Sequence, residues 1–246
     1  MVKYYDSVSP DLIEWALNQS VFFVASAPRH GRHVNLSPKG LPDASFAILG
    51  PNQAAYVDAT GSGNETISHL RENGRITVMF CSFDASPRIL RFFCKGSVIE
   101  WNQPEFGPYM ARMGGKNLPG ARAIICLDIF KVQTSCGFGV PLLALTIDPE
   151  TNTPKPYLKD RETLGHWAGK RVAAGQLHSY QKENNNSSLD GLPGLKSAVK
   201  DSGRSLWWSQ IRNWIHQYRD EIDLVKTSVL IMIFALEVAR WAGLFV

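Results

Sequence analysis

The sequence has few cysteines, and their spacing is not that of a metal site. Of the 246 residues only four are cysteine, namely Cys81, Cys94, Cys126 and Cys136. None belongs to a C-x-x-C pair and none has a histidine at metal-ligand spacing, which argues against zinc. The first three lie in apolar, strand-like runs, where cysteine usually behaves as a small hydrophobic residue.

Two further features are missing. The first residues, MVKYYDSVSPDLIEW, lack the apolar core of a secretory signal peptide. The 26 Lys and Arg against 22 Asp and Glu give a net charge of +4 without any basic block. The lack of a signal peptide, together with the small number of cysteines, indicates a reducing, intracellular compartment. The lack of a basic block argues against nucleic acid as a partner.

What the sequence does contain is a series of short β-rich runs. Ser9-Pro10-Asp11 predicts the start of a helix that ends near Gln19. Alternating apolar residues predict strands over 21–28, 33–37, 44–50, 54–59, 75–83, 88–101 and 121–137. Short helices are expected over 63–74 and 103–114. Because helices and strands do not alternate regularly, a mainly β (α+β) small antiparallel barrel is predicted for residues 1–148.

The character of the chain changes beyond this barrel. Residues 149–205 predict a Pro-rich linker, DPETNTPKP, then a helix over 158–184 packed on the barrel, and mostly loop over 185–205. Residues 206–246 predict a helical extension that holds four of the seven tryptophans.

The extension has an ambiguous apolar pattern. Residues 229–236 carry no polar side chain, but Lys226, Glu237 and Arg240 interrupt the wider window. The cost of inserting these charges nearly cancels the gain from the apolar residues. Two interpretations therefore stay open: a single-pass or peripheral membrane anchor on the cytoplasmic face, or a helical hairpin packed on the protein's own dimer.

Polar residues gather where the predicted strands end. In HVNLSPKG, Asn35 and Ser37 share one face of a strand, and Lys39 follows on the turn. In DATGSGNETISHL, a strand end and two glycines lead into a helix, whose first N–H groups favour an anion. The alternatives are a solvated hairpin end for Lys39 and ordinary helix N-caps for Ser62 and Asn64.

A third run, PRILRFF, carries two arginines on opposite faces of one strand. Arg88 shares its face with Leu90, and Arg91 shares the other with Ile89. An arginine on an apolar face is costly unless it is paired, so we expect one of the two to meet an anion or a carboxylate.

Taken in order, these runs resemble a known family. FFVASAP…HVNLSPKG, YVDATGSGNETISHLRENGRITVMFCSFD, RILRFFCKGSV and VQTSCGFGVP are similar to the pyridoxamine 5′-phosphate oxidase-like family, the FMN-binding split β-barrels, in a branch common in fungi. The resemblance covers about residues 8–145, and SLDGLPGL is also similar to that branch. It implies a six-stranded split barrel and a homodimer with two FMN molecules at its interface.

The resemblance assigns the polar residues to FMN. Those expected to line the ring and phosphate side are Asn35, Ser37 and Lys39. Those expected to contact the ribityl and phosphate oxygens are Thr60, Gly61, Ser62, Asn64 and Thr66. Arg88 or Arg91 would supply further charge.

Two departures from the family pattern argue against pyridoxamine phosphate as the substrate. Glu65-Thr66 stands where the true oxidases carry an Arg-Lys pair, and no Arg-Leu motif follows Gly137. The resemblance favours an FMN-dependent oxidase or reductase of a small organic molecule, in secondary metabolism. The alternative is a non-catalytic module that holds flavin or haem for storage or sensing. No His–Asp or Cys–His pairing assigns a catalytic residue.

Overall fold

The computed structural model describes residues 2–40, 42–116 and 118–241, and the chain divides into two compact units. The first unit is Met1–Leu164 and the second is Gly165–Val246. The division predicted from the sequence, into residues 1–148, 149–205 and 206–246, stays a prediction.

The first unit holds the following elements. Its strands are β1 (Lys3–Tyr5), β2 (Val21–Ser26), β3 (Asn35–Gly40), β4 (Phe46–Gly50), β5 (Gln53–Ala59), β6 (Arg75–Cys81), β7 (Arg88–Glu100), β8 (Ala121–Cys136), β9 (Leu142–Ile147) and β10 (Pro154–Lys159). Its helices are α1 (Pro10–Leu17), α2 (Pro42–Ser45), α3 (Glu65–Glu72) and α4 (Phe106–Arg112).

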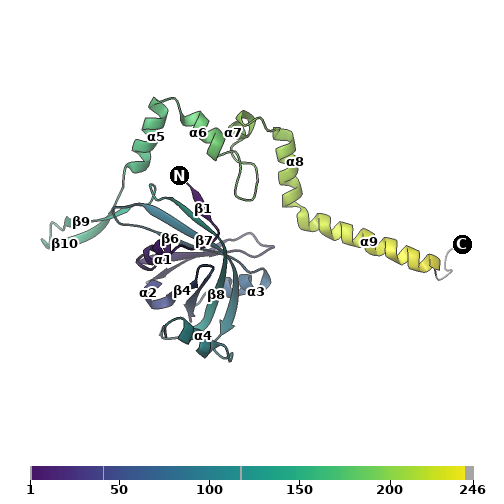
Figure 1. The fold of residues 1–246 in the computed structure, drawn as a ribbon, viewed down its shortest axis with the longest axis horizontal. Coiled ribbons are helices and arrows are strands. Elements are labelled where there is room, and N and C mark those ends of the chain that lie inside the picture. The colour runs from purple at the N-terminus through teal and green to yellow at the C-terminus, as the bar shows by residue number, and fades with distance from the viewer. Residues whose placement is uncertain (1, 41, 117, 242–246) are drawn as a thin grey trace. The chain divides into compact units, whose positions relative to one another are not determined.

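One antiparallel sheet forms the barrel of this unit (Figure 1). Its strands run in the order β3-β2-β6-β7-β8-β5-β4, and β1 pairs with β8 as an eighth strand. Within the described residues β3 and β4 are not paired, so the sheet stays open. The predicted split β-barrel is confirmed, with eight strands instead of six. β1 has only three residues, too few to leave a periodic signal in the sequence.

Aromatic rings, one from each of β2, β4, β5, β6 and β7, fill the barrel. Phe22, Phe46, Tyr56, Phe80 and Phe92 are fully buried, and neighbouring ring centroids lie 5.1–5.8 Å apart. In β2 every second side chain is buried, as the two-residue period of a strand requires. The buried face of α1 joins the same cluster, so the helix covers part of the core.

Residues 142–159 differ from the prediction. They form a hairpin of β9 and β10, paired from Leu142–Lys159 to Ile147–Pro154, where a linker and the start of a helix were expected. The Asp148 carboxylate closes the turn by accepting N–H bonds from Glu150 (2.9 Å) and Thr151 (3.3 Å). The prolines of this stretch gave the impression of a linker, but proline is tolerated in an edge strand, where its missing N–H is not needed.

The second unit is helical. Its elements are α5 (Thr163–Ala173), whose first two residues belong to the first unit, α6 (Leu177–Asn184), α7 (Lys196–Asp201), α8 (Leu206–Gln217) and α9 (Arg219–Trp241). The helix predicted over 158–184 is therefore two helices, separated at Gly175, whose φ of +65° suits glycine. Part of the predicted loop, Lys196–Asp201, is also a helix.

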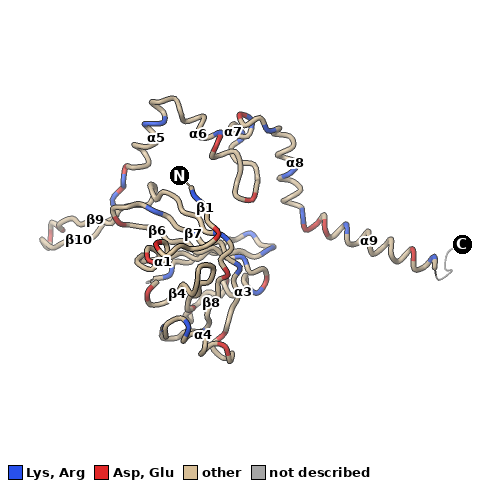
Figure 2. The backbone as a smooth tube through the Cα atoms, viewed as in Figure 1, with Lys and Arg blue, Asp and Glu red and all other residues tan. Residues whose placement is uncertain are grey.

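The membrane-spanning interpretation of the extension is wrong. No helix in the described residues combines the length and the apolar character that crossing a bilayer requires. α9 has 23 residues, but charged residues lie toward both of its ends (Figure 2) and leave a short apolar stretch, 229–236. A span needs about 20 predominantly apolar residues. The last residues of the predicted anchor, 242–246, lie outside the described residues.

Candidate functional site

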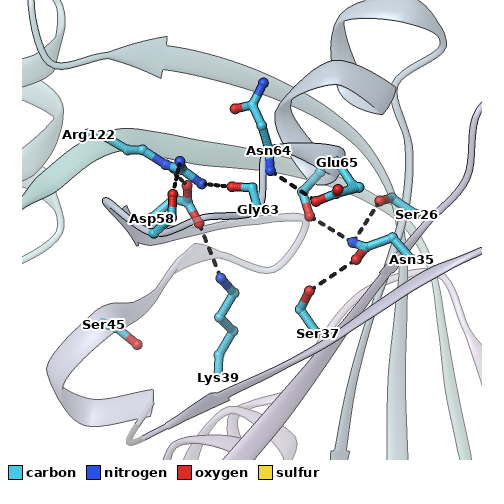
Figure 3. Close-up of polar contacts among 12 residues, drawn as sticks. Ser26, Asn35, Ser37, Lys39, Ser45, Asp58, Gly63, Asn64, Glu65 and Arg122 are labelled. Atoms are coloured by element: carbon cyan, nitrogen blue, oxygen red, sulfur yellow. Dashed lines mark hydrogen bonds and ion pairs between the residues drawn. The ribbon is translucent and has the colours of Figure 1, made fainter.

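A cavity of about 350 Å³ lies where β3 and β5 end and α3 begins. Its lining comes from four places: residues 37–39, residues 58 and 59, the loop 61–64 with the first turn of α3, and Arg122 of β8. Figure 3 shows the polar side chains around it. Six of the ten residues predicted from the sequence line this cavity: Ser37, Lys39, Gly61, Ser62, Asn64 and Thr66.

The alternation of β3 turns its polar residues to one side. Asn35, Ser37 and Lys39 are half-buried, while Leu36 and Pro38 between them are exposed. β3 is an edge strand paired to β2, which accommodates a proline. The predicted sharing of one face by Asn35 and Ser37 is confirmed.

Asp58 is the electrostatic centre of the cavity. Its carboxylate is 4% exposed and pairs with Lys39 Nζ at 3.2 Å and with Arg122 Nε at 2.7 Å (Figure 3). A buried carboxylate needs such partners, because an unpaired charge is costly away from water. The two cations are thus held side by side on one anion, each still about a quarter exposed (29% and 24%).

Arg122 also ties down the loop before α3. Its guanidinium donates to the carbonyl oxygens of Gly61 (3.3 Å) and Gly63 (2.5 Å) as well as to Asp58. Sequence reasoning missed Asp58 and Arg122. The available signal was an arginine in the otherwise apolar run ARAIICL, of the same kind that singled out Arg88 and Arg91.

A chain of hydrogen bonds runs from the cavity into the core. Ser37 Oγ donates to Asn35 Oδ1 (3.2 Å), and Asn35 Nδ2 donates to Thr66 Oγ1 (3.1 Å) and Ser26 Oγ (3.3 Å). Ser26 Oγ in turn bonds Nδ1 of the buried His69 at 2.9 Å. Asn35 therefore stands one bond behind the cavity wall and fixes β3 against α3.

The side chain of Glu65, the first residue of α3, binds back to the loop that leads into the helix. The backbone N–H of Asn64 donates to Glu65 Oε2 at 2.9 Å. Backbone N–H groups of Glu65 and Asn64 hold the pKa of the Glu65 carboxyl below its usual value, so it is ionised at neutral pH. Asn64 is the N-cap by position, as one alternative expected, but its side chain makes no capping bond.

Besides Asn35, three predicted residues do not line this cavity. Thr60 donates two hydrogen bonds to the carbonyl oxygen of Gly120, one from its backbone N–H (2.7 Å) and one from its Oγ1 hydroxyl (2.8 Å). Arg88 lies over the Trp15 ring, 5.5 Å from its centroid, in a second cavity of about 430 Å³ beside α1. Arg91, on the opposite face of β7, donates to Gln133 Oε1 (3.0 Å). Their roles toward a cofactor stay a prediction.

Comparison with known proteins identifies the family. The family model for pyridoxamine 5′-phosphate oxidase matches residues 12–136. A pyridoxamine 5′-phosphate oxidase family protein, ustO of Aspergillus flavus, is 59% identical over 243 residues, which is 99% of this chain and 98% of the relative. The chain belongs to the pyridoxamine 5′-phosphate oxidase family. The resemblance seen in the sequence motifs is thereby confirmed.

Solved structures are similar to about half of this chain. HupZ of Group A Streptococcus is 17% identical over 51% of this chain and 91% of its own, with a TM-score of 0.41. HutZ, a haem storage protein of Vibrio cholerae, is 15% identical over 50% of this chain and 89% of its own, with a TM-score of 0.36. An FAD-binding protein of Mycobacterium smegmatis is 8% identical over 53% of this chain and 97% of its own, with a TM-score of 0.37.

Proposed function

We propose that this family member is a flavoprotein, an FMN-dependent oxidoreductase that acts on a small organic molecule. The observation that supports it is the cavity between β3, β5 and α3. There Lys39, Arg122 and the loop 61–64 converge in a barrel of the oxidase family. Cations and backbone N–H groups at a helix start are the donors that a phosphate needs.

The donor set fits the polar end of FMN. Lys39 and Arg122 would hold the phosphate, and the hydroxyls of Ser62 and Thr66 would bond phosphate or ribityl oxygens. Ser37, braced by Asn35, would face the ring side. The bound flavin would accept or donate a hydride at N5, and the protein would bind, orient and shield it. No residue is assigned as a catalytic base.

We further propose that the protein works as a homodimer. A row of half-buried side chains crosses the outer face of the sheet: Phe23 of β2, Met79 of β6, Arg91 of β7 and Gln133 of β8 are register partners. Packing this face against a second copy would bury its apolar members. It would also place Arg91, which does not line the cavity of its own protomer, at the interface.

Pyridoxamine phosphate itself is not the substrate we propose. An acid, Glu65, faces the cavity where the oxidases carry an Arg-Lys pair, and the sequence after Gly137 lacks their Arg-Leu motif. The cavity is therefore less positive than that of a true pyridoxamine phosphate oxidase. The substrate we propose is a different small organic molecule.

The test is flavin binding by the purified protein. Lys39→Ala should weaken FMN by about 1.5–3 kcal/mol, roughly 10- to 150-fold in Kd, since a charge-assisted bond is lost. Lys155→Ala is the matched control, because Lys155 pairs with Asp148 at 3.3 Å on the β9–β10 hairpin, outside the cavity.

The outcomes separate the functions. A yellow protein whose flavin is bleached by NAD(P)H or a substrate and restored by air supports the oxidoreductase. Flavin that binds but stays inert to every reductant would replace it with a storage or sensing module. A protein that binds no flavin would refute both.

A further inference from the structure

Glu65 occupies the position at which the loop would receive an anion. Its Oε2 accepts the backbone N–H of Asn64 at 2.9 Å (Figure 3). A Cβ added to Gly63 would lie 2.9 Å from the same oxygen, so the carboxylate folds back over the Gly63–Asn64 backbone. Glu65 also lines the cavity together with Lys39 and Arg122. The chain thus supplies its own carboxylate to the donor that a phosphate would use.

The charges around the cavity balance without any ligand. Its lining holds two cations, Lys39 and Arg122, and two carboxylates, Asp58 and Glu65. Asp58 is buried and engages both cations, so it contributes to the framework of the site. Glu65 is exposed and its carboxylate accepts the backbone N–H of Asn64, so it is the negative charge that an incoming phosphate meets.

We infer that Glu65 is a specificity-determining residue that lowers the preference of this cavity for phosphate-bearing ligands relative to the same ligands without phosphate. The inference rests on the proposed function for its ligand class, the flavins. A phosphate must either displace the carboxylate from the Asn64 N–H or sit beside a like charge, and both are unfavourable. A ligand such as riboflavin, which lacks the phosphate, meets neither obstacle.

Glu65→Gln tests the charge while keeping the shape of the side chain. Glu72→Gln is the matched control: Glu72 is also on α3 and accepts a backbone N–H, from Arg29 at 2.6 Å, but it does not line the cavity. Kd values for FMN and riboflavin are measured by quenching of flavin fluorescence in both variants and in the natural protein. Thermal melting checks that each variant is folded.

The expected result is a change in ratio. In Glu65→Gln the affinity for FMN should rise about two- to fivefold, the range of an exposed charge interaction, with riboflavin unchanged. Glu72→Gln should alter neither. An unchanged ratio of FMN to riboflavin affinity in Glu65→Gln, with flavin still bound, would overturn the inference and leave the proposed function intact.

A second probe separates this inference from the proposed function. Inorganic pyrophosphate binding is measured by calorimetry on the same three proteins, and it requires no flavin. If no flavin binds at all, the proposed function fails, but tighter pyrophosphate binding by Glu65→Gln than by Glu72→Gln still supports the role of Glu65. Equal binding by the two variants, or binding by neither, would overturn it.

Discussion

Replacing Asp58 by asparagine removes one negative charge from the cavity and hardly changes its shape. In the native side chain Oδ1 accepts from Lys39 and Oδ2 accepts from Arg122. An asparagine keeps one acceptor oxygen and turns the other position into an NH₂ group, which cannot accept a bond. One of the two cations therefore loses its hydrogen-bond acceptor. No negative charge then remains on residue 58 to offset the repulsion between Lys39 and Arg122.

The cost follows from the burial of the pair. Breaking a fully buried ion pair by removing one partner costs about 3–5 kcal/mol. Here Asp58 is 4% exposed, but Lys39 and Arg122 are 29% and 24% exposed, so water replaces part of the lost interaction. We expect Asp58→Asn to lower the free energy of unfolding by about 2–3 kcal/mol, which corresponds to a Tm lower by about 4–12 °C.

Urea unfolding followed by circular dichroism measures this loss. The matched control is Asp223→Asn in α9, since Asp223 also stands between a lysine, Lys226 (3.4 Å), and an arginine, Arg219 (3.8 Å), but is 55% exposed. Its replacement should change the unfolding free energy by less than about 0.5 kcal/mol. Inorganic phosphate should stabilise Asp58→Asn more than the natural protein, because an anion can take the vacated place.

The reasoning would be refuted by a loss below about 1 kcal/mol in Asp58→Asn, the range of an ordinary surface pair. Equal stabilisation of both proteins by phosphate would separately contradict the view that Asp58 is the anion that holds the two cations together.

Three further predictions concern other parts of the first unit. Phe80→Ala should cost about 3–5 kcal/mol in urea unfolding, since its fully buried ring packs against three phenylalanine rings. Cys136 is exposed whereas Cys81 and Cys94 are buried, and burial raises the pKa of the Cys81 thiol, so Cys136 should be the first to react with a disulfide reagent. Backbone N–H groups of the β9–β10 turn hold the pKa of Asp148 below its ordinary value of 3.8. Its stabilising effect is thus present above that pH and lost as the pH falls through the lowered pKa, and Asp148→Asn should flatten the acid side of a Tm–pH profile.

Each of these has a contrary outcome. A Phe80→Ala protein within about 1 kcal/mol of the natural one would mean that the ring cluster is not the packed centre of the barrel. Rapid thiol reaction that persists in Cys136→Ser would assign it to another cysteine. Identical acid slopes for Asp148→Asn and the natural protein would remove the turn from the pH dependence.

Local pattern alone determined much of this protein. The two-residue alternation of VFFVAS places Phe22 and Val24 in the core, and Ser9-Pro10 begins a helix where predicted. These outcomes depend on neighbours in sequence, so the sequence is enough to predict them. The order of the strand-end motifs was likewise enough to recognise the family. Ser37 and Lys39, predicted from the run HVNLSPKG, both line the cavity, but Lys39 lies within β3 and not on a turn after it as expected.

Where the outcome depended on partners distant in the chain, only the tertiary structure decided it. The Pro-rich residues 154–159 are a strand because β9 pairs with them, and no local pattern announces that pairing. Asp58 and Arg122 are 64 positions apart, and they meet because β5 and β8 are paired in register. A charge in an apolar strand signals that it needs a partner, but the sheet alone specifies which one. That is why the centre of the cavity became visible only with the fold.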